Sequence, residues 1–266
     1  MTMLQLQIFV TRYIRDETFR ERVKMQPPDM QFKNFEFSKE ELNLANMLDL
    51  SQLDRISIKI MNERKEKRRA DLIEFVSVLQ QVGIYDEFCR SFAQANTVGS
   101  LSPKVDAQRF HNYAHQYIKE KGLPKVLSDL ATYSYQIFIV SQSALQDPFN
   151  DKTFNWDMPL FLKRPFKIKT FSYDLTQIID NPEIKTLEQL QRLPKKRTTY
   201  FFQKDYLNPI SSHVFEIDDP SFFDLLQKNY TAKEILQQAS SHEKQEEWKE
   251  LIKDIYESEI IGSKNP

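Results

Sequence analysis

The chain has 266 residues, a formal net charge of −1, 4 glycines and 1 cysteine. The near-neutral charge gives no overall field to attract nucleic acid or a membrane surface. The lone Cys89 excludes an internal disulfide and fits a reducing compartment. Loops that cradle phosphate need glycine for close backbone approach, so the scarcity of glycine argues against a nucleotide-binding enzyme.

Apolar residues recur at helical spacing through the first 150 residues. The N-terminal segment 4–23 is expected to form amphipathic helix rather than a signal peptide. Ser38 and Glu41 have the spacing of a capping box, and residues 53–81 predict one long helix. Further helices are expected over residues 85–95, 106–121 and 127–145. No apolar run approaches the roughly 20 residues of a membrane span, so we expect a cytoplasmic chain without a membrane partner.

The pattern changes after a linker rich in proline, asparagine and aspartate at residues 147–159. Alternating apolar and polar residues then predict short strands. Three helical segments follow them: one begins near Pro220, one begins at Thr231, which has the spacing of a capping box with Glu234, and the last covers residues 243–261. The expected fold is therefore multidomain. An all-α helical domain is expected at residues 1–150, and a small α+β winged-helix-like domain at residues 151–266.

We expect no catalytic centre, no metal and no cofactor. His111 and His115 lie four residues apart on a predicted helix, so both imidazoles can face one metal ion. The segment reads H-N-Y-A-H, however, and lacks the glutamate of a hydrolytic H-E-x-x-H motif. Two half-exposed polar residues beside an apolar helix face are the preferred interpretation.

A small sheet with its strands early and its helices late leaves one sheet edge exposed, and such an edge can receive an extended peptide as an added strand. We expect the strand 212–217 and the final helix to line that peptide site. Trp248 is either its bulky anchor or an ordinary core residue. The predicted peptide-binding residues are His213, Val214, Phe215, Glu216, Ile217, Trp248, Leu251, Ile252 and Ile255.

The alternative function is a winged-helix DNA-binding regulator that reads DNA with residues 231–239. This segment carries Lys233, Gln237 and Gln238 but few basic residues, whereas phosphate contacts need clustered lysine and arginine. We therefore expect no nucleic-acid partner.

Residues 105–135 resemble a segment of the partner proteins of multinuclear non-haem iron-dependent oxidases, which modify ribosomally made peptides. The upstream run Arg64-Lys-Glu-Lys-Arg68, followed by Tyr85, Phe88 and Phe92, is similar to a helix pair of the same partners. The C-terminal part resembles a PqqD-like peptide-recognition module. The positions that carry the first resemblance are Asp106, Phe110, Tyr113, Pro124, Leu127, Asp129, Leu130, Ala131 and Tyr133.

This resemblance implies a non-catalytic protein that binds the leader of a ribosomally made precursor peptide. It further implies that the chain docks an iron-dependent oxidase in a hetero-oligomer, presents the peptide for post-translational modification, and carries no iron of its own.

Overall fold

The computed structural model describes residues 3–27, 30–33, 35–96, 102–150, 153–179 and 181–263, without the side chains of residues 61 and 64–71. The chain forms two compact units, Met1–Lys121 and Gly122–Pro266. None of the described helices is long and apolar enough to cross a membrane.

The first unit begins with a small aromatic core. Helices α1 (Leu4–Arg15), α2 (Glu17–Met25) and α3 (Lys39–Asn46) surround it together with the start of α4 (Leu50–Asp71). Phe9 is fully buried and meets the rings of Phe19, Phe32 and Phe35 at 5.1 to 5.8 Å between ring centroids. Edge-on aromatic contacts of this kind hold the connector after α2 against α1.

The second half of this unit contains α5 (Ile73–Gln81), α6 (Tyr85–Ala95) and α7 (Pro103–Glu120). The predicted single helix over residues 53–81 is interrupted at Leu72, whose φ of −134° and ψ of 55° are not helical. Leu72 is 1% exposed, so the break directs this side chain into the core. Phe88 packs edge-on against Phe110 at 5.1 Å and joins α6 to α7.

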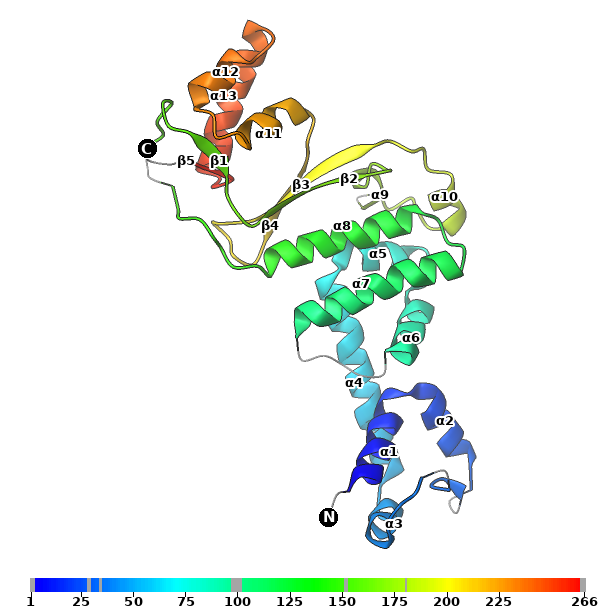
Figure 1. Cartoon of the computed structure of the whole chain (residues 1–266). Coiled ribbons are helices and arrows are strands. Elements are labelled where there is room, and N and C mark those ends of the chain that lie inside the picture. Colours follow the sequence, from blue (N-terminus) through cyan, green and yellow to red (C-terminus); the bar gives the residue numbers. More distant parts are fainter. Residues whose placement is uncertain are drawn as a thin grey trace. The chain divides into compact units, whose positions relative to one another are not determined.

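The second unit is organised around a three-stranded antiparallel sheet in the order β2 (Phe166–Phe171), β3 (Thr198–Lys204), β4 (Ser212–Glu216). Helix α8 (Val126–Ser141) covers one face, where Tyr133 meets Tyr200 at 5.2 Å and Phe202 at 5.3 Å. Short helices α9 (Thr176–Ile179) and α10 (Leu187–Gln191) lie in the connection between β2 and β3 (Figure 1).

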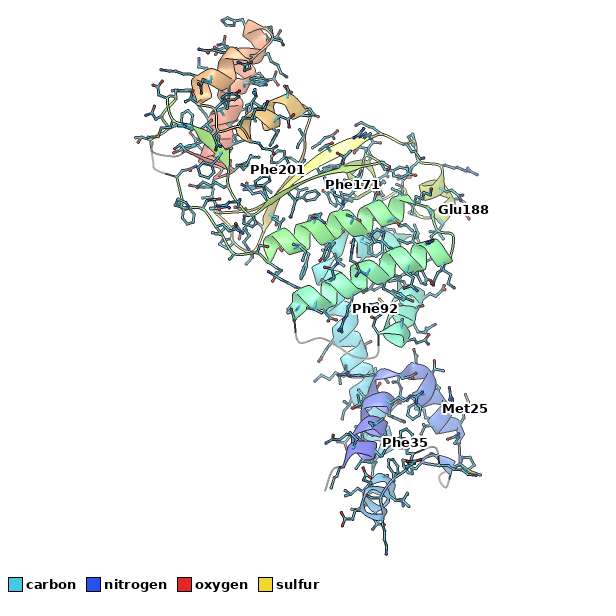
Figure 2. All side chains as sticks on the ribbon, in the orientation of Figure 1. Met25, Phe35, Phe92, Phe171, Glu188 and Phe201 are labelled. Carbon is cyan, nitrogen blue, oxygen red and sulfur yellow. The ribbon has the colours of Figure 1, made fainter. Side chains whose placement is uncertain are left out.

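The other face of the sheet carries the C-terminal core. Helices α11 (Pro220–Leu226), α12 (Ala232–Gln237) and α13 (His242–Glu257) pack there with a two-stranded sheet of β1 (Leu160–Leu162) and β5 (Ile261–Ser263). Phe201 and Phe171, both labelled in Figure 2, belong to opposite faces of the three-stranded sheet: Phe201 to the C-terminal core and Phe171 to the α8 side. The central strand β3 is thus buried on both sides, whereas residues 167–170 of the edge strand β2 are exposed.

The prediction of a helical region followed by an α+β region is confirmed. The border between the compact units lies between Lys121 and Gly122, earlier than the predicted border after residue 150. The reason is that α8 packs on the sheet and so belongs to the second unit.

Candidate functional site

The outer edge of β4 is defined by its hydrogen bonds to β3. The Ile217 amide donates to the Thr199 carbonyl at 2.8 Å, and the Asp205 amide donates to the Ser211 carbonyl at 3.3 Å. The register between these two pairs is continuous. Because neighbouring residues of an antiparallel strand alternate in direction, the N–H and C=O groups of Ser212, Val214 and Glu216 point away from β3.

Three of the predicted strand residues, His213, Phe215 and Ile217, lie on the C-terminal-core face. Phe215 is half-buried, with its ring 5.0 Å from Phe201 and 5.8 Å from Phe223. Ile217 is buried. The His213 Nε2 lies 3.5 Å from the Asp205 Oδ1. This face of β4 therefore combines an aromatic platform with one imidazole.

The other predicted strand residues, Val214 and Glu216, lie on the α8 face and are half-buried. The Glu216 carboxylate is 3.8 Å from the Lys196 Nζ, which also contacts Asp174 at 2.8 Å. One end of the edge thus carries a lysine shared by two carboxylates.

The predicted helix residues occupy the core instead of a surface. Trp248, Ile252 and Ile255 are all buried, and Leu251 is half-buried against the same core. The Trp248 ring lies 5.3 Å from Phe222. The core role of Trp248 is therefore the alternative that the structure favours, and α13 reaches β4 through Phe222 and Phe223.

Asp219 links the end of β4 to α13. Its carboxylate accepts hydrogen bonds from the Trp248 indole at 3.2 Å and from the Ser221 hydroxyl, and it pairs with Lys244 at 3.0 Å. Burial alone would raise the pKa of Asp219, but the donors from Ser221 and Lys244 outweigh it and lower the pKa to about 2. The carboxylate is therefore ionised and structural.

Asp174 plays a similar part beside Lys196. It accepts hydrogen bonds from the Thr176 hydroxyl at 2.7 Å and from the Tyr200 hydroxyl at 3.2 Å, in addition to Lys196. Burial opposes ionisation, yet these donors lower the pKa of Asp174 to about 2. Lys196 is thereby held beside the β4 edge.

Lys163 and Glu259 form a buried ion pair that was not predicted from the sequence. The Lys163 side chain is 1% exposed. Its Nζ contacts the Glu259 carboxylate and donates to the Pro148 carbonyl at 2.8 Å. Glu259 also accepts from the Asn150 amide at 3.1 Å. These residues are about 100 positions apart, so no local signal could have found the pair.

The DNA alternative depends on α12 and the residues around it. Lys233 is the lysine of α12 and pairs with Asp157 at 2.7 Å. Glu234 accepts a hydrogen bond from the Thr231 amide in a capping box. Both charged side chains are therefore engaged within the unit. The side chains of the basic run Arg64-Lys-Glu-Lys-Arg68 lie outside the described part of the structure.

His111 and His115 do meet. Their Nε2 atoms are 3.0 Å apart, and their rings cross at 78° with centroids 4.6 Å apart. Both side chains are half-buried on α7.

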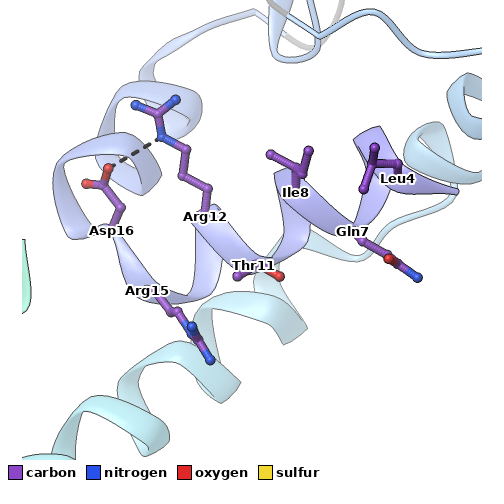
Figure 3. A pocket seen from close by; sticks show the side chains of 7 residues that line it. All are labelled: Leu4, Gln7, Ile8, Thr11, Arg12, Arg15 and Asp16. Atoms are coloured by element: carbon purple, nitrogen blue, oxygen red, sulfur yellow. Dashed lines mark ion pairs between the residues drawn. The ribbon is translucent and has the colours of Figure 1, made fainter. Parts of the chain in front are cut away.

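A hollow of about 580 Å³ lies along α1, where Leu4 and Ile8 form an apolar end and Arg12 and Arg15 a basic end (Figure 3). Arg12 is engaged with Asp16 at 3.5 Å and lies over the Phe19 ring at 4.6 Å. None of the residues that line this hollow is a predicted site residue.

No protein-family model and no curated protein matches the chain.

Proposed function

We propose that the chain is a non-catalytic partner that binds an extended segment of a ribosomally made precursor peptide along the outer edge of β4. We further propose that it presents this peptide to a multinuclear non-haem iron-dependent oxidase. The single observation that carries the peptide part is the set of backbone groups at Ser212, Val214 and Glu216 that point away from β3.

An extended peptide can pair with these groups as a fourth strand. Main-chain hydrogen bonds then supply affinity, and alternate side chains contact the two faces of β4. On one face a peptide side chain would lie beside Phe215, and on the other beside Val214 or Glu216. The expected ligand therefore alternates apolar and polar residues.

The order of elements supports a peptide-recognition module. Three antiparallel strands are followed by α11, α12 and α13, which is the order of the winged-helix, PqqD-like module that the resemblance implies. In this proposal β4 is the receiving strand. Because α13 is buried through Trp248 and Ile252, it supports the site from behind and does not line it.

The oxidase part of the proposal rests on the resemblance of residues 105–135. We expect the chain to contribute no chemistry, because the charged groups around β4 have structural partners: Asp219 holds Lys244, and Asp174 holds Lys196.

Fluorescence anisotropy of a labelled precursor peptide, encoded next to the gene of this chain, tests the proposal. We expect saturable binding by the full chain, no binding of a scrambled peptide, and co-purification with an oxidase encoded beside it. The proposal is wrong if the isolated chain consumes oxygen or alters the peptide by itself. A salt-dependent shift of duplex DNA at micromolar protein would favour the DNA-binding alternative.

A further inference from the structure

The facing imidazoles of His111 and His115 form a chemical group that the proposed peptide binding does not use. Helix α7 holds both side chains, and their Nε2 atoms approach to 3.0 Å. In neutral imidazoles at this distance, one Nε2 carries the proton and the other directs its lone pair at it. A metal ion that replaces this proton would lie to one side of the line between the two nitrogens and bind both, with each lone pair turned toward it.

The spacing of the two nitrogens indicates which metals fit. With metal–nitrogen bonds of about 2.0–2.1 Å, a separation of 3.0 Å corresponds to an angle of about 95° at the metal. That angle suits two neighbouring positions of a square-planar or tetragonal ion. A tetrahedral ion needs the nitrogens about 3.3 Å apart, so zinc would require the rings to separate.

We infer that His111 and His115 form a two-histidine chelate for a divalent late transition-metal ion of tetragonal preference, with Cu²⁺ bound most tightly and Ni²⁺ next. Imidazole is a favoured ligand of these ions, and affinity for a given site rises from Ni²⁺ to Cu²⁺. This inference departs from the sequence-based expectation of no metal.

Among the side chains that the structure describes, no group of three or more histidines, cysteines or carboxylates is arranged to hold a metal. In this proposal, water or an exchangeable ligand completes the coordination sphere. The site differs in this respect from a closed structural zinc site, which uses four protein ligands.

Copper titration of the full chain, followed by electron paramagnetic resonance, tests the inference. We expect one Cu²⁺ per chain, a tetragonal spectrum, and nitrogen hyperfine structure from two imidazoles. His111→Gln and His115→Gln should each weaken Cu²⁺ binding by about 100-fold, because the second nitrogen of a chelate binds at high effective concentration. His242→Gln, which changes an exposed histidine at the start of α13, is the matched control and should leave binding unchanged.

Cu²⁺ binding that persists in the double variant would overturn the inference, as would a spectrum with fewer than two imidazole nitrogens or no binding at micromolar Cu²⁺. The spectrum of the unmodified chain decides the matter even if the variants do not fold. None of these outcomes bears on peptide binding, so the two proposals stand or fall separately.

Discussion

The amide of Ile217 donates to the carbonyl of Thr199 at 2.8 Å. This one bond sets the phase of β4, because its residues alternate in direction along the strand. It places the N–H groups of His213 and Phe215 toward β3 and that of Val214 toward the outside. Neighbouring residues of one short strand are therefore expected to differ in function: one set holds the sheet, and the other is free to receive a peptide.

Val214→Pro should weaken peptide binding while leaving the fold intact. Proline removes an N–H group that points away from β3, and sheet edges tolerate proline at such positions. The unfolding free energy should change by less than about 1 kcal/mol. Peptide affinity should fall at least tenfold through the lost hydrogen bond and the ring that replaces it. Urea denaturation and peptide anisotropy measure the two effects.

The matched control is His213→Pro, one residue earlier on the same strand. Its N–H group faces β3, so the substitution removes a ladder hydrogen bond and should cost about 3 kcal/mol of stability. Equal stability losses for the two variants would contradict the assigned alternation.

Substitution of Trp248 should lower the stability of the chain and leave its peptide affinity unchanged. Its ring is 4% exposed and packs on Phe222. Trp248→Ala should lower the unfolding free energy by about 3–5 kcal/mol. Trp248→Phe keeps a ring but loses the hydrogen bond to Asp219, and it should cost about 1–2 kcal/mol. If Trp248→Phe instead weakened peptide binding tenfold at unchanged stability, Trp248 would be an anchor of the peptide site.

The buried pair of Lys163 and Glu259 predicts strong coupling. Lys163→Met or Glu259→Gln alone should destabilise the chain by about 3–5 kcal/mol, because each leaves one buried charge without its partner. The double variant should lose less stability than the sum of the losses in the two single variants. Denaturant unfolding of all four proteins measures this coupling.

The surface pair of Lys249 and Glu246 is the control for this cycle. Its atoms are 3.1 Å apart, but the side chains are 41% and 53% exposed. Lys249→Met should therefore change stability by less than about 1 kcal/mol. If the double-mutant cycle of Lys163 and Glu259 gave no coupling energy, the interaction between these two side chains would contribute nothing to the free energy of unfolding.

Acid should destabilise the second unit through Asp174 and Asp219. The pKa of each carboxyl is about 2 in the folded chain, below its ordinary value near 4. The unfolded chain therefore binds protons more readily than the folded chain. The contribution of the two carboxylates to the free energy of unfolding is complete above about pH 4 and is lost as the pH falls toward 2. Each shift corresponds to at most about 2–3 kcal/mol.

Asp174→Asn tests this pH dependence. It should reduce the unfolding free energy by up to about 2–3 kcal/mol at pH 7 and by much less at pH 2.5, where the native carboxylate is itself becoming protonated. Asp157→Asn changes an exposed carboxylate and is the control. A stability loss for Asp174→Asn that is equal at both pH values would contradict the assignment.

Local signals in the sequence predicted the parts of the fold that depend on a few neighbouring residues. The capping boxes of Ser38 with Glu41 and of Thr231 with Glu234 are both present. The strand predicted over residues 212–217 is β4. Each capping box depends on two side chains three residues apart, and the strand was predicted from the residue types of its own segment.

Features that depend on distant partners could not be predicted. The final helix was expected to run to Ile261, but α13 ends at Glu257, and Ile261 pairs with Leu162 about 100 residues earlier. Leu72 begins the apolar stripe that resumes after the charged run 63–69, and neither glycine nor proline marks the helix break there. Leu251, Ile252 and Ile255 have the spacing of an amphipathic helix, but that spacing does not tell whether the apolar face meets a core or a ligand.

Amide hydrogen exchange of β4, with and without saturating precursor peptide, tests the central claim most directly. We predict new protection of the amides of Ser212, Val214 and Glu216, with little change at His213 and Phe215, which already bond to β3. Peptide binding that leaves the amides of Ser212, Val214 and Glu216 unprotected, or that protects another element instead, would contradict strand addition at β4.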